Sequence, residues 1–299
     1  MASAMTGEIP TVLVMGATCV DRVLSVPAYP SPDSKIRTTS SVDMCGGNAA
    51  NVGAALALLS ASPFTYARHA ESGAGGSAAA ALRVVLLTKV GDDDAAVHLK
   101  ADLESRGVDC SSQLFVMQPH STTSITTVIA SESEHTRTCL HSPGSCGELT
   151  VAEVEEVLSS SENGDELFRN VVLFHSDTRH TSAAVALAKE ARRRGIPMSV
   201  DVEKDRGPVM TELVANASIV FGNEDKLQEY ASRRHDERPA DRPSRSLFSY
   251  TYTHASTDAA TDSESVHVER NEECLHRISS LLRHGDDAIQ QDKSVVVTR

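Results

Sequence analysis

The sequence has few aromatic residues and no long hydrophobic run. Its 299 residues include no Trp, and aromatic residues make up only 4%. The core must therefore be built from Val, Leu, Ile and Ala. No apolar stretch reaches the roughly 20 residues that a membrane-spanning helix needs, and Arg83 interrupts the most apolar candidate, at 78–87. The first ten residues lack a basic start followed by an apolar segment, so we expect no signal peptide.

Basic residues are also in the minority. Lys and Arg total 28 against 41 Asp and Glu, which gives a formal net charge of −13. A phosphate backbone repels such a chain, so general nucleic-acid binding is not expected. The net charge does not exclude a local basic pocket for one small phosphate. The six cysteines form no Cys-x-x-Cys pair, which argues against a zinc site and a disulfide framework. We expect a cytoplasmic protein with free thiols and no membrane segment.

The remaining composition is that of a globular protein, with 40% hydrophobic and 23% charged residues and no internal repeat. Short apolar, β-branched runs alternate with segments of helical periodicity, which predicts an α/β fold with a mainly parallel sheet. Thr150 and Glu153 have the spacing of a capping box at a helix start. The predicted strands are 11–15, 84–88, 171–174, 198–202, 218–221 and 294–298, and the main predicted helices are 49–59, 95–106 and 183–194.

Two stretches interrupt this alternation. Residues 67–80 are rich in Ala, Gly and Ser, and residues 232–269 contain almost no aliphatic side chains. Such segments cannot bury enough apolar surface to offset the entropy of ordering, so we expect flexible insertions. Residues 124–130 and 136–141 predict a pair of strands joined by the polar turn 131–135.

The strongest local motif is MCGGNAANVGAALALL at 44–59. Gly46 and Gly47 precede Asn48 and Asn51 at the start of a predicted helix. Backbone N–H groups at a helix start, together with amides that both donate and accept, suit a polyhydroxylated ligand. The motif is neither a P-loop nor a dinucleotide fingerprint. A purely structural interpretation, an Asn N-cap behind a tight glycine turn, explains the pattern equally well.

Polar residues also follow several predicted strands. Asp21 lies just beyond the first strand, where a carboxylate can accept hydrogen bonds from sugar hydroxyls; a solvated Asp or an ion pair with Arg22 is the alternative. Glu203, Lys204 and Asn223 also follow strands, where such groups position a nucleotide phosphate or hold Mg²⁺ through water. Capping of the next helix is the simpler alternative there. No set of metal ligands is predicted.

Taken in order, these motifs resemble one family. The segments GATCVDRVLSVPAYP, SSVDMCGGNAANVGAALALL and LLTKVGDDDAAVHLKADLESRGVD resemble the PfkB or ribokinase family of carbohydrate kinases. LFHSDTRH and IVFGNED are most similar to its ketohexokinase and fructokinase-like branch. The resemblance implies one kinase domain over 1–299 with a three-layer α/β/α core and a small β lid from about 24–42 and 124–141. It also implies ATP-dependent phosphorylation of a sugar hydroxyl with Mg²⁺.

The resemblance also assigns residues. Cys19 stands where ribokinases have Asn, which argues against ribose itself, and Lys226 replaces the Glu of the family's Asn-x-x-Glu element. The candidate substrate-binding residues are Asp21, Gly46, Gly47, Asn48, Asn51, Arg137, Asp177 and Arg179, and the candidate nucleotide or phosphate residues are Asn223, Glu203 and Lys204.

The family's Asp-Thr-x-Gly-Ala-Gly-Asp signature does not occur in the 299 residues. In the family it carries the catalytic base and an anion hole, so no catalytic residue is assigned here. We expect a truncated kinase that lacks its C-terminal part and turns over sugar and ATP poorly. A catalytically dead sugar-binding or regulatory protein and a nucleoside kinase of the adenosine type are the alternatives. A homodimer through the lid is a further expectation from the resemblance.

Overall fold

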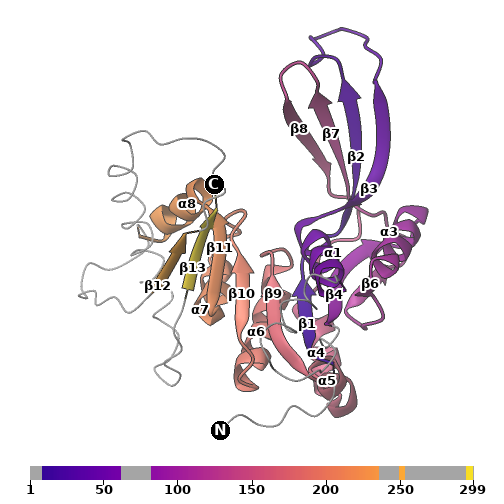
Figure 1. Cartoon of the computed structure of the whole chain (residues 1–299). Helices are drawn as coiled ribbons and strands as arrows, with labels where there is room; N and C mark the ends of the chain where they lie inside the picture. Colours follow the sequence, from indigo (N-terminus) through magenta and orange to yellow (C-terminus); the bar gives the residue numbers. More distant parts are fainter. Residues whose placement is uncertain (1–8, 62–81, 236–248, 253–293, 299) are drawn as a thin grey trace, which may run out of the picture. The chain divides into compact units, whose positions relative to one another are not determined.

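The computed structural model describes residues 9–61, 82–235, 249–252 and 294–298 (Figure 1). The chain divides into two compact units, Met1–Val172 and Leu173–Arg299. Each combines parallel strands with helices, which confirms the predicted α/β class. Within the described residues, no helix has both the length and the apolar character needed to cross a membrane.

The core of the first unit is a group of short parallel strands. β1 is buried at every position, and it pairs with β4 from Thr11↔Arg83 to Met15↔Leu87. Apolar residues of β1 and β4 such as Leu13 and Leu86 are fully buried, as expected for strands covered on both faces. The strands are β1 (Thr11–Met15), β4 (Arg83–Gly91), β5 (Val108–Asp109) and β6 (Phe115–Gln118), and the helices are α1 (Asn48–Ser60), α3 (Asp94–Ser105), α4 (Val151–Ser159) and α5 (Ser161–Leu167).

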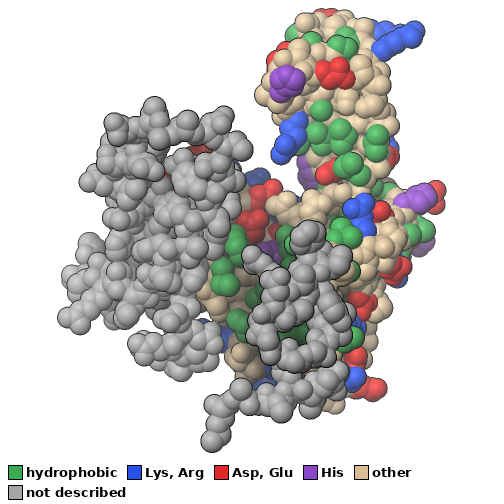
Figure 2. Space-filling view, viewed as in Figure 1, with side chains coloured by type: hydrophobic (Ala, Val, Ile, Leu, Met, Phe, Trp, Pro, Cys, Tyr) green, Lys and Arg blue, Asp and Glu red, His purple; other side chains and the backbone are tan. Residues whose placement is uncertain are grey.

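A separate four-stranded sheet forms the lid (Figure 1). Its order is β3-β2-β7-β8, with β2 parallel to β7 and both edge strands antiparallel to their neighbours. The strands are β2 (Cys19–Val26), β3 (Ser40–Gly46), β7 (Ile125–Ser131) and β8 (Thr136–Ser142). Basic, acidic and hydrophobic side chains are interspersed on the lid surface (Figure 2).

The hairpin prediction for 124–141 is confirmed to within one residue, but the prediction for 24–42 is wrong at both ends. β2 begins at Cys19, and β3 continues to Gly46. In β2, charged side chains lie on both faces of the lid sheet, with Asp21 on one face and Arg22 on the other. The simple alternation of a half-buried strand is therefore missing, and only the prolines at 27, 30 and 32 marked the loop.

The second unit contains five strands in the order β12-β13-β11-β10-β9, with every pair parallel. The insertion predicted at 232–269 is corrected in two places, because α8 includes residues 232–235 and residues 249–252 form β12 beside the valine-rich β13. The rest of that stretch and residues 67–80 lie outside the described residues. The elements are β9 (Val171–Ser176), α6 (Thr181–Arg193), β10 (Met198–Asp201), α7 (Val209–Asn216), β11 (Ile219–Asn223), α8 (Glu224–His235), β12 (Ser249–Tyr252) and β13 (Ser294–Thr298).

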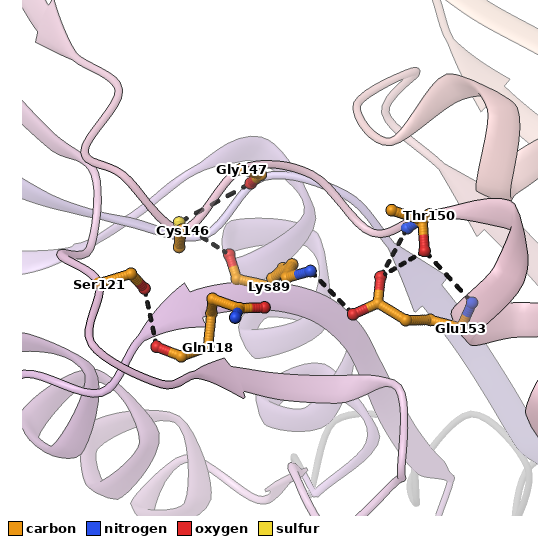
Figure 3. Close-up of polar contacts among 7 residues, drawn as sticks. All are labelled: Lys89, Gln118, Ser121, Cys146, Gly147, Thr150 and Glu153. Atoms are coloured by element: carbon orange, nitrogen blue, oxygen red, sulfur yellow. Dashed lines mark hydrogen bonds and ion pairs between the residues drawn. The ribbon is translucent and has the colours of Figure 1, made fainter.

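A buried ion pair ties α4 to the end of β4 (Figure 3). Lys89 Nζ donates to Glu153 Oε1 at 2.8 Å, and the Lys89 side chain is only 8% exposed. Glu153 Oε2 accepts from the Thr150 backbone N–H at 2.7 Å, while Thr150 Oγ1 accepts from the Glu153 N–H at 3.2 Å, which confirms the capping box. Burial alone would raise the pKa of Glu153, but Lys89 and Thr150 outweigh burial and hold this pKa below its usual value.

We predict that Lys89→Met lowers the free energy of unfolding by about 1–3 kcal/mol, because it leaves the Glu153 carboxylate without its buried cation. Lys189→Met is the control, since Lys189 forms an ion pair of the same 2.8 Å length with Glu212 but is 61% exposed. The control should change stability by less than about 0.5 kcal/mol. Denaturant unfolding measures both variants, and equal effects would contradict the prediction.

Candidate functional site

The lid register brings polar side chains of three strands into one row. Asp21 lies opposite Thr126, and Thr126 lies opposite His141. Residues that pair directly across neighbouring strands point to the same face of a sheet. We call this side of the lid the Asp21 face. The opposite face carries Arg22 and Asp43, which also pair directly.

Hydrogen bonds connect this row. The Cys19 thiol donates to Asp21 Oδ1 at 3.4 Å and lies 3.7 Å from Thr126 Oγ1, which in turn lies 3.1 Å from His141 Nδ1. Burial is the main cause that raises the pKa of Cys19 to about 12, and the neighbouring Asp21 carboxylate adds to the rise. The thiol therefore stays protonated at neutral pH and acts as a donor that orients the Asp21 carboxylate.

The two glycines of the motif are required by contacts. A Cβ atom at Gly46 would lie 2.1 Å from Cγ of Asp21, so only glycine lets the carboxylate lie against this turn. Gly47 has φ 96°, and a Cβ atom there would lie 2.3 Å from the Ala17 carbonyl oxygen. The pair leads the chain from β3 into α1 beneath Asp21.

The geometry decides two alternatives that the sequence left open. The N-cap of α1 is Gly47, without a side-chain cap, so Asn48 is the first helical residue rather than an Asn cap. Within the described residues, the side chains of Asn48 and Asn51 have no hydrogen-bond partner. Arg22 pairs with Asp43 at 2.7 Å on the opposite face, so it does not neutralise Asp21.

The opposite face of the lid and α3 line a pocket of about 360 Å³. Its two arginines are already paired, Arg22 with Asp43 and Arg106 with Asp102, each through two hydrogen bonds. Cys45 also lines it, and burial raises the pKa of that thiol to about 11. This pocket therefore offers neither an unpaired charge nor a reactive thiolate.

In the second unit, the loop after β9 holds Asp177 and Arg179. Asp177 is 1% exposed, and its Oδ1 accepts from the Arg179 backbone N–H at 2.9 Å. Thr178 and His180 adopt left-handed conformations with φ 68° and 57°, which is a strained geometry for a β-branched residue such as Thr178. Arg206 Nε donates to Thr178 Oγ1 at 3.3 Å and holds the loop.

A buried histidine supports this loop from the strand. His175 Nδ1 lies 2.9 Å from Ser199 Oγ on the neighbouring strand, and its ring contacts Phe221 edge-on at 6.4 Å. Nε2 is buried and has no partner within the described part of the chain. Burial lowers the pKa of His175 to about 4, so the imidazole is neutral at physiological pH.

The candidate phosphate residues lie at strand ends of the second unit. Glu203 and Lys204 are exposed just beyond β10, while Asn223 ends β11. Asn223 Oδ1 accepts from the Lys226 N–H at 2.9 Å, so it caps α8 as the simpler alternative predicted. Among the described residues, no group of three His, Cys, Asp or Glu side chains could hold a metal ion.

The structure thus groups the predicted residues in three places. Asp21 and the 46–51 motif lie together at the base of the lid, Asp177 and Arg179 share the loop after β9, and the candidate phosphate residues follow β10 and β11. Arg137 is on the Asp21 face, four residues along β8 from the row. Sequence reasoning missed Cys19 as a donor, together with Thr126 and His141. The hairpin turn at 131–135 fixes the pairing register of β7 and β8. From this register, the pairing of Thr126 with His141 could have been predicted.

Comparison with known proteins identifies the family of this chain. The model of the "pfkB family carbohydrate kinase" family matches residues 10–242. The chain therefore belongs to the PfkB family of carbohydrate kinases. It is 28% identical over 221 residues to an ATP-dependent ribose-1-phosphate kinase of Halopiger xanaduensis, a match that covers 72% of this chain and 62% of that protein. The chain thus spans less than two thirds of the length of this relative.

Solved structures show the ribokinase-like fold. Ribokinase of Giardia lamblia matches with a TM-score of 0.62 at 13% identity, over 97% of this chain and 69% of that one. Arabidopsis thaliana ribokinase complexed with ribose and ATP gives 0.59 at 15% identity, over 97% and 71%. Fructokinase of Xylella fastidiosa with bound ATP gives 0.52 at 18% identity, over 75% and 61%.

We predict that Gly47→Ala lowers the free energy of unfolding by at least about 2 kcal/mol, because it forces both a left-handed alanine and a clash with backbone. Gly53→Ala is the control: its Cβ atom would lie 3.7 Å from Val84, an ordinary contact, within α1. The control should be neutral or stabilise by up to about 1 kcal/mol. Comparable losses in both variants, measured by denaturant unfolding, would show that the Gly47 conformation is not required.

A second prediction concerns pH. Since the folded state lowers the pKa of His175 from 6.5 to about 4, His175 contributes stability above pH 6.5 that is lost as the pH falls toward 4. His175→Gln, which retains a hydrogen-bonding partner for Ser199, should flatten the fall of the melting temperature across this window. The exposed His98 provides the control variant, His98→Gln, whose curve should follow the wild type. An unchanged slope in His175→Gln would refute the assignment.

Proposed function

We propose that this PfkB-family chain binds a sugar against the Asp21 face of the lid and belongs to an ATP-dependent kinase that phosphorylates one of its hydroxyls. The observation that carries the proposal is the Asp21 carboxylate, which the Cys19 thiol orients directly above the Gly46 turn. A carboxylate accepts hydrogen bonds from two neighbouring hydroxyls, and the amides of Asn48 and Asn51 donate and accept at the adjacent helix start. The combination is selective for a polyhydroxylated molecule.

Within the second unit, we propose a phosphate-binding role for residues at strand ends. Arg179 and the exposed Glu203 and Lys204 follow the carboxyl ends of parallel strands, the edge at which α/β sheets bind ligands. Mg²⁺ would arrive with ATP, bound chiefly by phosphate and water oxygens, so it needs only one or two carboxylates such as Glu203. With Asn223 already engaged as a helix cap, we assign it a positioning role at most.

The identity of the sugar belongs to the proposal as well. The segments at 173–180 and 219–225 favour a ketohexose, as in the ketohexokinase and fructokinase-like branch. Cys19 in place of Asn disfavours unmodified ribose. The named relative from Halopiger xanaduensis acts on ribose 1-phosphate, which makes a phosphorylated pentose the competing substrate. A nucleoside is the third alternative.

A second candidate function is sugar binding without catalysis. It requires only the Asp21 face and the Gly46 turn. For either function the lid could also join two copies of the chain, since the edge strands β3 and β8 are exposed and carry the exposed apolar side chains Val42, Met44 and Leu140.

We predict that Asp21→Asn weakens sugar binding roughly 10–100-fold, because it replaces a charged acceptor of hydroxyl hydrogen bonds. Asp43→Asn is the matched control, on the neighbouring strand but on the opposite lid face, and should retain wild-type affinity. Isothermal titration with fructose, ribose and ribose 1-phosphate measures both variants.

Equal effects of the two substitutions, or no sugar binding by the wild type, would contradict the proposed site. A coupled assay of ADP release on the same protein separates the two candidate functions. Sugar-dependent ADP release supports the kinase, and binding without ADP release supports the sugar-binding protein.

A further inference from the structure

The pocket between the lid and α3 lies on the lid face opposite Asp21, within the first compact unit. Its lid wall includes Val20, Cys45 and Ile125, which share a face because Val20 pairs directly with both of the others. α3 packs against β2 and β3 (Figure 1) and contributes a stripe of side chains that includes Ala95 and Leu99, one helical turn apart. A volume of about 360 Å³ is near the lower end for ligand sites, so the pocket suits a single small ring system.

The inner part of this pocket is apolar. Val20 and Leu99 are buried, and Ala95 and Ile125 are half-buried. Cys45 adds a protonated thiol, which is a small and weakly polar group. These side chains give a ligand apolar contact and almost no hydrogen bonding, which favours the face of a ring over a polyhydroxylated molecule.

Two arginines line the same pocket, and the flat faces of their guanidinium groups remain available. Arg22 binds Asp43, and Arg106 binds Asp102, each through Nε and Nη2. These paired bonds use one edge of the planar guanidinium group and leave its faces uncovered. The side chains of Arg22 and Arg106 are 46% and 43% exposed, so a ligand can reach them. Guanidinium faces stack on aromatic rings.

The charges of the pocket balance one another. Each arginine has an aspartate partner, so a ligand of either charge would lie near a side chain of its own sign. His98 of α3 also lines the pocket, is exposed, and has no hydrogen bond or ion pair within the described residues. Its imidazole can donate to or accept from one polar atom at the edge of a ring. The lining therefore selects a neutral aromatic heterocycle.

The pocket lies directly behind the candidate sugar site. Val20 and Arg22 line it from the two positions of β2 that flank Asp21. Cys45 lines it from the position of β3 before Gly46, the residue against which the Asp21 carboxylate lies. A ligand in the pocket thus contacts the reverse side of the two strands that hold Asp21 in place.

We propose that this pocket is an effector site for a neutral, planar aromatic heterocycle, and that its occupant tightens sugar binding at Asp21. The binding site stands on the pocket alone, whereas the effect on sugar rests on the proposed function. An occupant that contacts α3 together with β2 and β3 links the lid to the core. The sugar then binds strands that are already ordered, and it loses less conformational entropy on binding.

The first test is a fluorescence titration of the full 299-residue chain with indole. The chain contains no Trp, so the fluorescence of the indole ring can be excited without interference. We expect a dissociation constant on the order of 0.1–1 mM, as for other ligands of this size. Indole-3-acetate and tryptamine carry the same ring with a negative and a positive charge, and each should bind at least about 5-fold more weakly. Equal binding of either charged analogue would refute the neutral ligand class.

Substitutions in α3 locate the bound ring. Ala95→Leu fills the pocket and should weaken indole binding at least about 10-fold, whereas the control Val97→Leu, at an exposed position of the same helix, should keep wild-type affinity. Arg106→Lys keeps the charge but loses the planar face, so it should weaken binding about 2–5-fold. Wild-type affinity in Ala95→Leu would overturn the site, and wild-type affinity in Arg106→Lys would overturn the stacking.

Hydrogen exchange of the wild-type chain gives the same answer without any substitution. Saturating indole should slow the exchange of amides in β2, β3 and α3, and leave those of α7 unchanged. Protection confined to other elements would place indole elsewhere and refute the pocket assignment.

The effect on sugar is measured by isothermal titration with fructose and ribose, with and without saturating indole. We expect sugar to bind at least about 5-fold more tightly when indole is bound. Unchanged sugar affinity would show that the pocket is a binding site but not an effector site. If neither sugar binds under either condition, the proposed function and the effector role both fail, while the indole titration alone decides the pocket. If indole does not bind, the whole inference fails and the proposed function stands.

Discussion

The close approach of the Asp21 carboxylate to the Gly46 backbone is the constraint on which the rest of the candidate site depends. A single methyl group at Gly46 would occupy the place of the carboxylate, 2.1 Å from its Cγ atom. The contact joins β2 to the turn that begins α1, so the lid strand and the helix start are positioned by the same pair of residues. It also places the Asn48 amide at the base of the lid, beside the proposed sugar site.

The two faces of the lid sheet differ in how their charged side chains are paired. One face of β2 and β3 packs toward α3. On this face Arg22 of β2 pairs with Asp43, and Arg106 at the end of α3 pairs with Asp102. On the other face, charged groups have few protein partners, apart from weak donors such as the Cys19 thiol. In a sheet with one apolar, buried face, apolar and polar side chains alternate along the sequence of each strand. Here both faces carry charge, for different reasons.

The presence of charged residues on both faces of the lid limited what could be predicted from the sequence. Strands buried on both faces, such as β1, follow from their apolar β-branched runs, and the Thr150 capping box follows from spacing alone. The start of β2 at Cys19 did not follow, because its polar residues do not alternate. The glycine motif was found, but whether Asn48 caps or follows the turn depended on the left-handed φ of Gly47.

Residues that act through tertiary pairing were the hardest to find. His141 is 120 residues from Asp21 in the chain, and only the register of three strands places them in one row. The same holds for His175, which is neutral because it is buried beside Ser199 of β10 and Phe221 of β11. The local sequence pattern does not tell which strands lie next to each other in the sheet. A buried neutral imidazole costs little to desolvate, whereas a charged one would be expelled. The end of β9, from which the strained loop at Thr178 begins, can therefore contain a buried histidine and still be well packed.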